Sequence, residues 1–96
     1  MKYVVLTVNL ADTKKAVPII FPDFMVHDDL VKSVTTLLEE VHKLKVTGIL
    51  SAGEIDMDQV FCSGYSSTLK VYSRDEEDDN LIESYDYMHG MLGETE

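Results

Sequence analysis

Residues 28–44, DDLVKSVTTLLEEVHKL, form the most regular pattern in the chain. Apolar residues recur there every three to four positions, the spacing that gives an α-helix one apolar face. They are Leu30, Val31, Val34, Leu37, Leu38, Val41 and Leu44. His27 and the two aspartates after it supply capping groups and negative charge at the N-terminal end. We therefore expect an amphipathic helix over residues 28–44, with the pairs Asp28–Lys32 and Glu39–Lys43 exposed along it.

Two strands are expected before this helix. Residues 2–9 (KYVVLTVN) and 16–21 (AVPIIF) are rich in β-branched and aromatic residues, which favour a pleated, largely buried segment. Pro18 lacks a backbone N–H, so the second of these strands should lie at an edge of its sheet.

The chain after the helix alternates short β-rich runs with turn residues. Residues 46–57, 59–64 and 68–72 predict a three-stranded antiparallel meander, with a bulge or bend near residues 51–53. Ser73 and Glu76 have the spacing of a capping box, and Gly90 suits a helix end, so we expect a second helix over residues 75–89.

The order of elements is therefore β-β-α-β-β-β-α, which predicts an α+β fold. We expect a mainly antiparallel sheet of up to five strands, with one or both helices packed on one face. A chain of 96 residues and 10.8 kDa supports one hydrophobic core, so residues 1–90 should form a single domain. Residues 91–96 have no apolar periodicity and predict a flexible acidic tail.

Charge is distributed unevenly along the chain. The net charge is −10, and residues 1–45 carry as many lysines as acids, so the whole excess lies in residues 46–96. This balance opposes direct binding to nucleic acid, which draws most of its affinity from Lys and Arg. No apolar run approaches the roughly 20 residues that span a bilayer, and the start of the chain does not resemble a secretory signal. With one cysteine, a reducing cytoplasm is the expected compartment.

Two acidic clusters are the candidate functional residues. In the first, Glu54, Asp56 and Asp58 alternate with Ile55 and Met57, so the carboxylates should share one face of a strand while the apolar pair faces the core. The second is an unbroken acidic run at the start of the second helix, with two more acids further along it. Its members are Asp75, Glu76, Glu77, Asp78, Asp79, Glu83 and Asp86.

Catalytic, metal and cofactor chemistry has weak support in the sequence. The segment after Asp56 and Asp58 lacks the glycine and the further oxygen ligands of a calcium loop, and the three histidines are too scattered for a zinc site. Surface or capping roles are expected for the histidines, and core packing for Cys62. No catalytic residue, metal or cofactor is assigned, and the chain is expected not to be an enzyme.

The pattern of turn and strand residues resembles short uncharacterised proteins of bacteriophages and bacterial prophages. The resemblance is carried by residues 51–53 (SAG), 62–66 (CSGYS), 68–69, 73–74 and 81–82, together with residues 2–4 (KYV) and 18–22 (PIIFP). It implies a small protein that acts by binding host machinery, including nucleic-acid mimics that occupy basic sites of defence or transcription complexes. The acidic run of residues 75–79 is heavier here than in that group.

Two functions remain open. The first is a non-enzymatic module that presents carboxylates to a basic surface of a host nucleic-acid-handling or defence protein, in the host cytosol. The alternative is a structural or accessory domain that forms a homodimer or larger homo-oligomer through the edge near Pro18 or the apolar face of the second helix.

Overall fold

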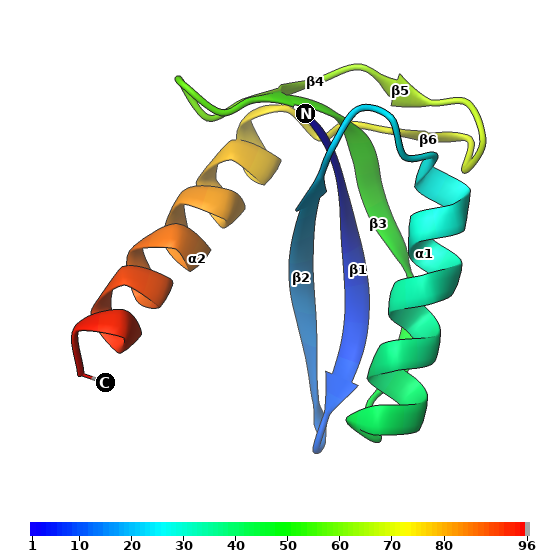
Figure 1. The fold of residues 1–96 in the computed structure, drawn as a ribbon, viewed down its shortest axis with the longest axis vertical. Helices are drawn as coiled ribbons and strands as arrows, with labels where there is room; N and C mark the ends of the chain where they lie inside the picture. Colours follow the sequence, from blue (N-terminus) through cyan, green and yellow to red (C-terminus); the bar gives the residue numbers. More distant parts are fainter. Residues whose placement is uncertain (96) are drawn as a thin grey trace.

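The central strand of the protein is β1 (Lys2–Leu10), which pairs antiparallel with β2 (Thr13–Phe21) on one side and β3 (Lys45–Asp56) on the other. A short strand, β4 (Phe61–Ser63), extends the sheet beyond β3 and gives the order β2-β1-β3-β4. This computed structural model describes the backbone of residues 1–95 and the side chains of residues 1–85. Figure 1 shows the arrangement. The α+β class and the mainly antiparallel sheet are confirmed, and β2 with its Pro18 is an edge strand as expected.

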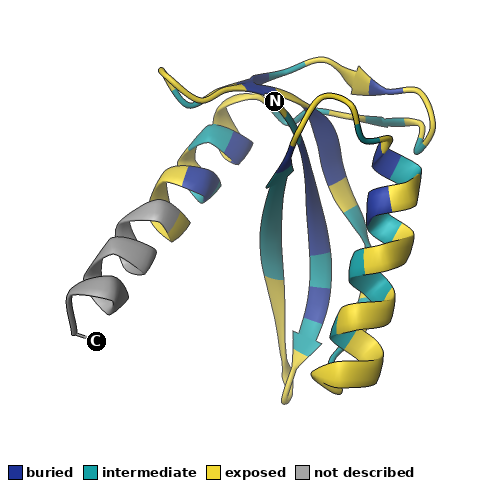
Figure 2. Ribbon diagram, in the orientation of Figure 1, coloured by how far each residue is buried: buried dark blue, intermediate teal, exposed yellow. Residues whose placement is uncertain are grey.

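The side chains of β1 alternate between two separate apolar clusters. Val4, Leu6 and Val8 face one side of the sheet, where α1 (His27–Thr36) packs through Leu30. Tyr3 and Val5 face the other side, where α2 (Glu76–Thr95) packs through Ile82. Since a strand alternates its side chains, an unbroken apolar strand needs cover on both faces. The two helices therefore lie on opposite faces of the sheet and not on one. Figure 2 shows β1 as the most deeply buried strand.

The first helix changes its winding before it ends. Residues 37–41 form a π-helical turn, η1 (Leu37–Val41), in which the N–H of His42 bonds to the carbonyl of Leu37. The wider turn rotates the following residues relative to a regular helix. Within this turn Leu37 and Val41 are 49% and 64% exposed, although the helical pattern places them on the apolar face.

The start of α1 also differs from the expectation. Val26 is the N-cap residue and no side chain caps the helix. His27 is buried instead, with its Nε2 donating to the carbonyl of Gly53 at 3.0 Å and its ring edge-on to Phe21. Of the two expected helical ion pairs, Asp28–Lys32 forms at 3.2 Å, whereas Glu39 accepts a hydrogen bond from the N–H of Val46.

The β-rich second half is divided between two sheets and is not a single meander, because β3 and β4 belong to the four-stranded sheet. The run at 59–64 gives β4, and β5 (Tyr65–Ser66) then pairs with β6 (Val71–Tyr72) in a separate two-stranded sheet. Gly64, at φ 91°, makes the bend between β4 and β5. The register of β3 with β1 shifts at Leu50, next to the bulge expected near residues 51–53, and again at Thr47.

The backbone of α2 continues past Gly90 to Thr95, so the expected helix end at Gly90 is wrong. Ser73 does not form the expected capping box: its Oγ accepts from the N–H of Asp75, the residue before the start of α2 at Glu76. The expectation of a flexible tail concerns residues 91–96, whose side chains lie outside the described part of the chain.

Gly53 is required by a close approach of two strands. A Cβ built at Gly53 would lie 2.3 Å from the carbonyl oxygen of Ser63, which is backbone and cannot move aside. At Gly48 a Cβ would meet only the hydroxyl of Thr7, at 3.2 Å.

We expect Gly53→Ala to lower the free energy of unfolding by roughly 1–3 kcal/mol or more, because β3 and β4 must separate to admit the methyl group. Gly48→Ala is the matched control, since only a side-chain hydroxyl has to adjust. Urea unfolding of both variants measures the difference. Equal stability of the two variants would contradict the close approach at Gly53.

Candidate functional site

Asp78, in the first turns of α2, is fully buried and bonded on both carboxylate oxygens. Oδ2 accepts from the hydroxyl of Tyr3 at 2.5 Å and from the backbone N–H of Arg74 at 2.9 Å. Oδ1 accepts from the hydroxyl of Ser51 at 2.9 Å and from two guanidinium nitrogens of Arg74, each at 2.8 Å. The side chain thus ties α2 to β1 and β3, and it has no surface left for a partner. This corrects the expectation that Asp78 belongs to a partner-binding run.

The ionisation of Asp78 follows from these contacts. Burial alone would raise its pKa, but the hydrogen bonds from Tyr3, Arg74 and Ser51 outweigh burial and hold the pKa below the ordinary value of 3.8. Burial and the neighbouring carboxylate raise the pKa of the Tyr3 hydroxyl, so Tyr3 remains a donor. At neutral pH the group is a buried carboxylate with a full set of donors.

Two neighbouring acids also hold the chain together. Asp79 accepts a hydrogen bond from the backbone N–H of Cys62 at 2.6 Å and so fastens α2 to β4. Glu77 pairs with Arg74 at 3.4 Å on the surface. Cys62 itself is fully buried, as expected for core packing, and burial raises its pKa to about 12, with Asp79 contributing in the same direction. A thiol in this state is protonated at neutral pH and a poor nucleophile.

The remaining acids of the run are on the surface. Asp75, Glu76 and Glu83 are exposed, as Glu77 is, while Asp79 is half-buried. Asp86 lies outside the part of the chain whose side chains are described. The five-residue run is therefore divided by function: one fully buried acid, one bonded to β4 and three at the surface.

The first acidic cluster keeps the geometry that its alternation predicts at residues 54–56 but not at residues 57 and 58. Glu54 and Asp56 are exposed on one face at the end of β3, and Ile55 between them is buried on the other. Asp58 lies in the following turn, where its N–H bonds to the carboxylate of Asp56 at 3.0 Å. Met57 does not face the core: it lies in the same turn and is 46% exposed.

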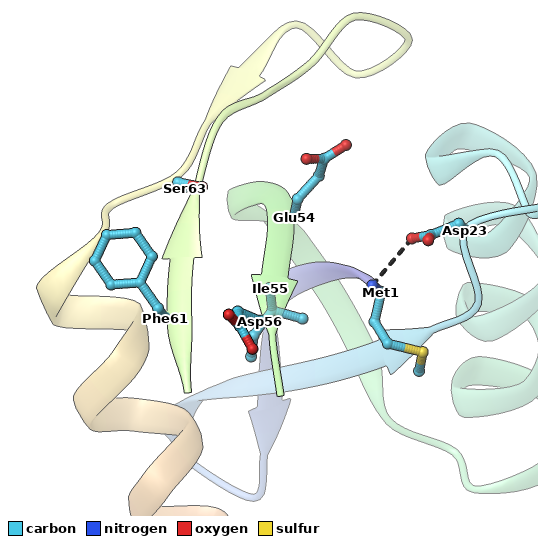
Figure 3. Close-up of a pocket in the computed structure, with 7 residues that line it drawn as sticks. All are labelled: Met1, Asp23, Glu54, Ile55, Asp56, Phe61 and Ser63. Carbon is cyan, nitrogen blue, oxygen red and sulfur yellow. Dashed lines mark ion pairs between the residues drawn. The ribbon is translucent and has the colours of Figure 1, made fainter. Parts of the chain in front are cut away.

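A shallow pocket of about 250 Å³ lies beside Glu54 and Asp56 (Figure 3). Phe61 and Ser63 line it from β4, because Asp56 and Glu54 are their register partners in β3. The ring of Phe61 is 57% exposed. Acidic and aromatic side chains thus meet on one open surface at this end of the sheet.

Asp23 adds a third carboxylate to this pocket. It follows β2, 31 residues before Glu54 in the sequence, and its Oδ1 forms an ion pair of 3.0 Å with the amino group of Met1. No sequence pattern connects Asp23 with β3. The only available signal is topological: antiparallel β1 and β2 bring the end of β2 beside the start of β1.

The two acidic clusters do not form one surface. Glu54 and Asp56 point away from the face on which Ile55 and Cys62 contact α2. The acids of α2 therefore lie on the other side of the β3–β4 ladder. We call the pocket-lining set Asp23, Glu54, Asp56 and Phe61 the acidic-aromatic patch.

Other kinds of site find little support in the part of the chain with described side chains. Among those side chains, no three His, Cys, Asp or Glu are arranged to hold a metal ion. None of the helices over the described residues has the length and apolar character needed to cross a bilayer. His27 is a buried structural residue and not a surface one, and its Nε2 must carry a proton because the Gly53 carbonyl can only accept.

Comparison with known proteins gives no match: no family model, curated protein or solved structure is similar to this chain.

We expect Asp78→Asn to lower the free energy of unfolding at neutral pH by about 3–5 kcal/mol, because Arg74 keeps only its longer surface pair with Glu77 and the buried amide NH2 group of Asn would face other donors. Glu77→Gln, one residue away on the surface, should cost less than about 1 kcal/mol. Tyr3→Phe removes one donor and should have an intermediate cost of about 1–2 kcal/mol. Chemical unfolding measures all three.

The same contacts set the acid sensitivity. The pKa of Asp78 is lower in the folded protein than in the unfolded chain, so the unfolded chain binds more protons at acidic pH. The contribution of Asp78 to the free energy of unfolding is therefore complete above the unfolded pKa. It is lost as the pH falls through the folded pKa. An Asp78→Asn variant as stable as Glu77→Gln, or one with the same acid-dependent loss as the parent protein, would contradict this role.

Proposed function

We propose that this protein is a small non-enzymatic interaction module whose acidic-aromatic patch binds a basic side chain on the surface of a partner protein. The observation that supports this most is the pocket lined by the carboxylates of Asp23, Glu54 and Asp56 and by the exposed side chain of Phe61. The other acidic cluster is less suited, since Asp78 and Asp79 are engaged inside the fold.

The chemistry of the patch favours Arg or Lys. Carboxylates bind guanidinium and ammonium groups through charge-assisted hydrogen bonds, and an aromatic face attracts the same cations. Asp23 is already paired with the amino group of Met1 at 3.0 Å, so Glu54 and Asp56 are the carboxylates of the patch that we propose to bind the partner's cation. The net charge of −10 would add attraction over a longer range, which salt screens.

The resemblance to phage and prophage proteins supports a partner in the host cytosol, such as a nucleic-acid-handling or defence protein with a basic site. Because the acids lie on two sides of the β3–β4 ladder, we propose a contact centred on one patch rather than a continuous imitation of a nucleic-acid backbone.

The homo-oligomeric alternative has less support. Over the part of α2 whose side chains are described, the apolar face is used by the chain itself, since Leu81 and Ile82 pack against the sheet. The edge strand β2 is also contacted, because the hydroxyl of Tyr85 donates to the carbonyl of Ala16 at 2.8 Å, two residues from Pro18.

A titration with a short synthetic arginine-glycine peptide, followed by amide chemical shifts at low and moderate salt, tests this proposal. We expect the largest shifts at residues 54–56 and 61–63, and an affinity that falls as salt is added. Glu54→Gln with Asp56→Asn should weaken binding about fivefold, in proportion to two exposed ion pairs.

Glu76→Gln with Glu83→Gln is the matched control, because it removes the same charge from exposed positions on α2. It should change the affinity less than twofold. An equal loss in both double variants would mean that only net charge matters, and a larger loss in the α2 variant would place the binding surface on the helix.

A further inference from the structure

A second hollow lies at the other end of the sheet from the acidic-aromatic patch. Its volume is about 380 Å³, and it is lined by Val8, Leu10, Lys15, Val17, Leu44 and Tyr85. We call it the apolar groove. Pockets that bind small molecules are mostly apolar, have volumes of roughly 300–1,000 Å³ and contain a few polar groups that fix orientation.

The sheet and the helix positions create this groove. Lys15 pairs with Val8, and Val17 with Leu6, so these side chains share the face of the sheet on which α1 packs. In Figure 1, however, α1 lies on the β3 side while β2 forms the opposite edge. This end of β1 and β2 is incompletely covered, and Leu10 remains 49% exposed.

Two residues from elsewhere in the chain complete the walls. Leu44 comes from the connection between η1 and β3, where its N–H bonds to the carbonyl of Leu38 at 2.9 Å. Tyr85 comes from α2, and its hydroxyl bond to the carbonyl of Ala16 holds it at the edge of β2. The groove is therefore built from three separate parts of the fold.

The lining of the groove carries one charged side chain, which is positive, whereas the net charge of the whole protein is −10. Lys15 is the one charged residue of the lining, and it takes part in no ion pair among the described side chains. Leu44 is flanked by Lys43 and Lys45. Two acids lie near these residues in the sequence: Asp12, exposed in the turn between β1 and β2, and Glu39, which is bonded to the N–H of Val46.

We propose that the apolar groove binds a free single-chain carboxylate, a medium-chain fatty acid in chemical class. The hydrocarbon chain would cover Leu10, Val17 and Leu44, and the carboxylate would pair with Lys15. Burial of the chain supplies the affinity and Lys15 the preference for a negative head group. This site is separate from the acidic-aromatic patch, so it stands or falls independently of the proposed function.

The neighbouring lysine provides a matched control. Lys14 and Lys15 are adjacent in β2, so they point to opposite faces of the sheet, and Lys14 pairs with Asn9 away from the groove. Lys15→Gln and Lys14→Gln change the net charge equally, and both positions are exposed.

The experiment is a titration with decanoate below its micelle concentration, followed by methyl and amide chemical shifts of the full chain. We expect saturable shifts at Val8, Leu10, Val17 and Leu44. Lys15→Gln should weaken binding about threefold and Lys14→Gln less than twofold, as one exposed ion pair predicts. Decyltrimethylammonium, with the same chain and a cationic head, should bind more weakly than decanoate.

Several results would overturn the proposal. Shifts that do not saturate, or that fall outside the groove, would remove the site. Equal losses in the Lys14 and Lys15 variants, or equal binding of the cationic detergent, would remove the role of Lys15. Binding to vesicles of anionic phospholipid without binding to free decanoate would show that the surface contacts a lipid bilayer and not a single free chain.

Discussion

The buried carboxylate of Asp78 is the interaction on which the arrangement of this protein depends. Removing a charge from water costs several kcal/mol unless it is paired and hydrogen-bonded. Here donors from β1, β3 and the start of α2 all reach one side chain. Each of these elements must be in place before the carboxylate is satisfied, so the contact selects one position of α2 against the sheet.

This constraint also determines what the acidic second half of the chain can do. Because Asp78 and Asp79 bind the fold, the acidic run contributes fewer surface charges than its sequence indicates. The alternation of side chains in β3 instead places acids on the surface, since Ile55 is buried on the side of α2 and Glu54 and Asp56 point outward. The surface proposed for partner binding is thus a consequence of how α2 is fixed on the opposite face.

Local sequence patterns predicted the elements well where one physical requirement decides the outcome. The β-branched run of β1 and the proline of β2 gave the right strands and the right edge. Helical periodicity placed α1, but the π-helical turn that contains the exposed Leu37 and Val41 leaves no signal in the spacing of apolar residues.

The candidate site was predictable only in part. Alternation predicted that Glu54 and Asp56 share an exposed face, whereas Asp23 joins them through the topology of the sheet. The role of Asp78 could not be found from the sequence, because its partners Tyr3 and Ser51 lie 75 and 27 residues away. Five adjacent acids look alike in a sequence, and only the packing of α2 decides which of them faces inward.

The most direct test of this account is the pKa of Asp78 in the folded protein, measured by the pH dependence of its side-chain carboxyl carbon in an NMR titration. The account predicts a carboxylate that stays ionised below pH 3.8, with a pKa lower than its ordinary value, until the protein unfolds. A pKa at or above the ordinary value would mean that burial outweighs the hydrogen bonds, and it would contradict the central role of this carboxylate.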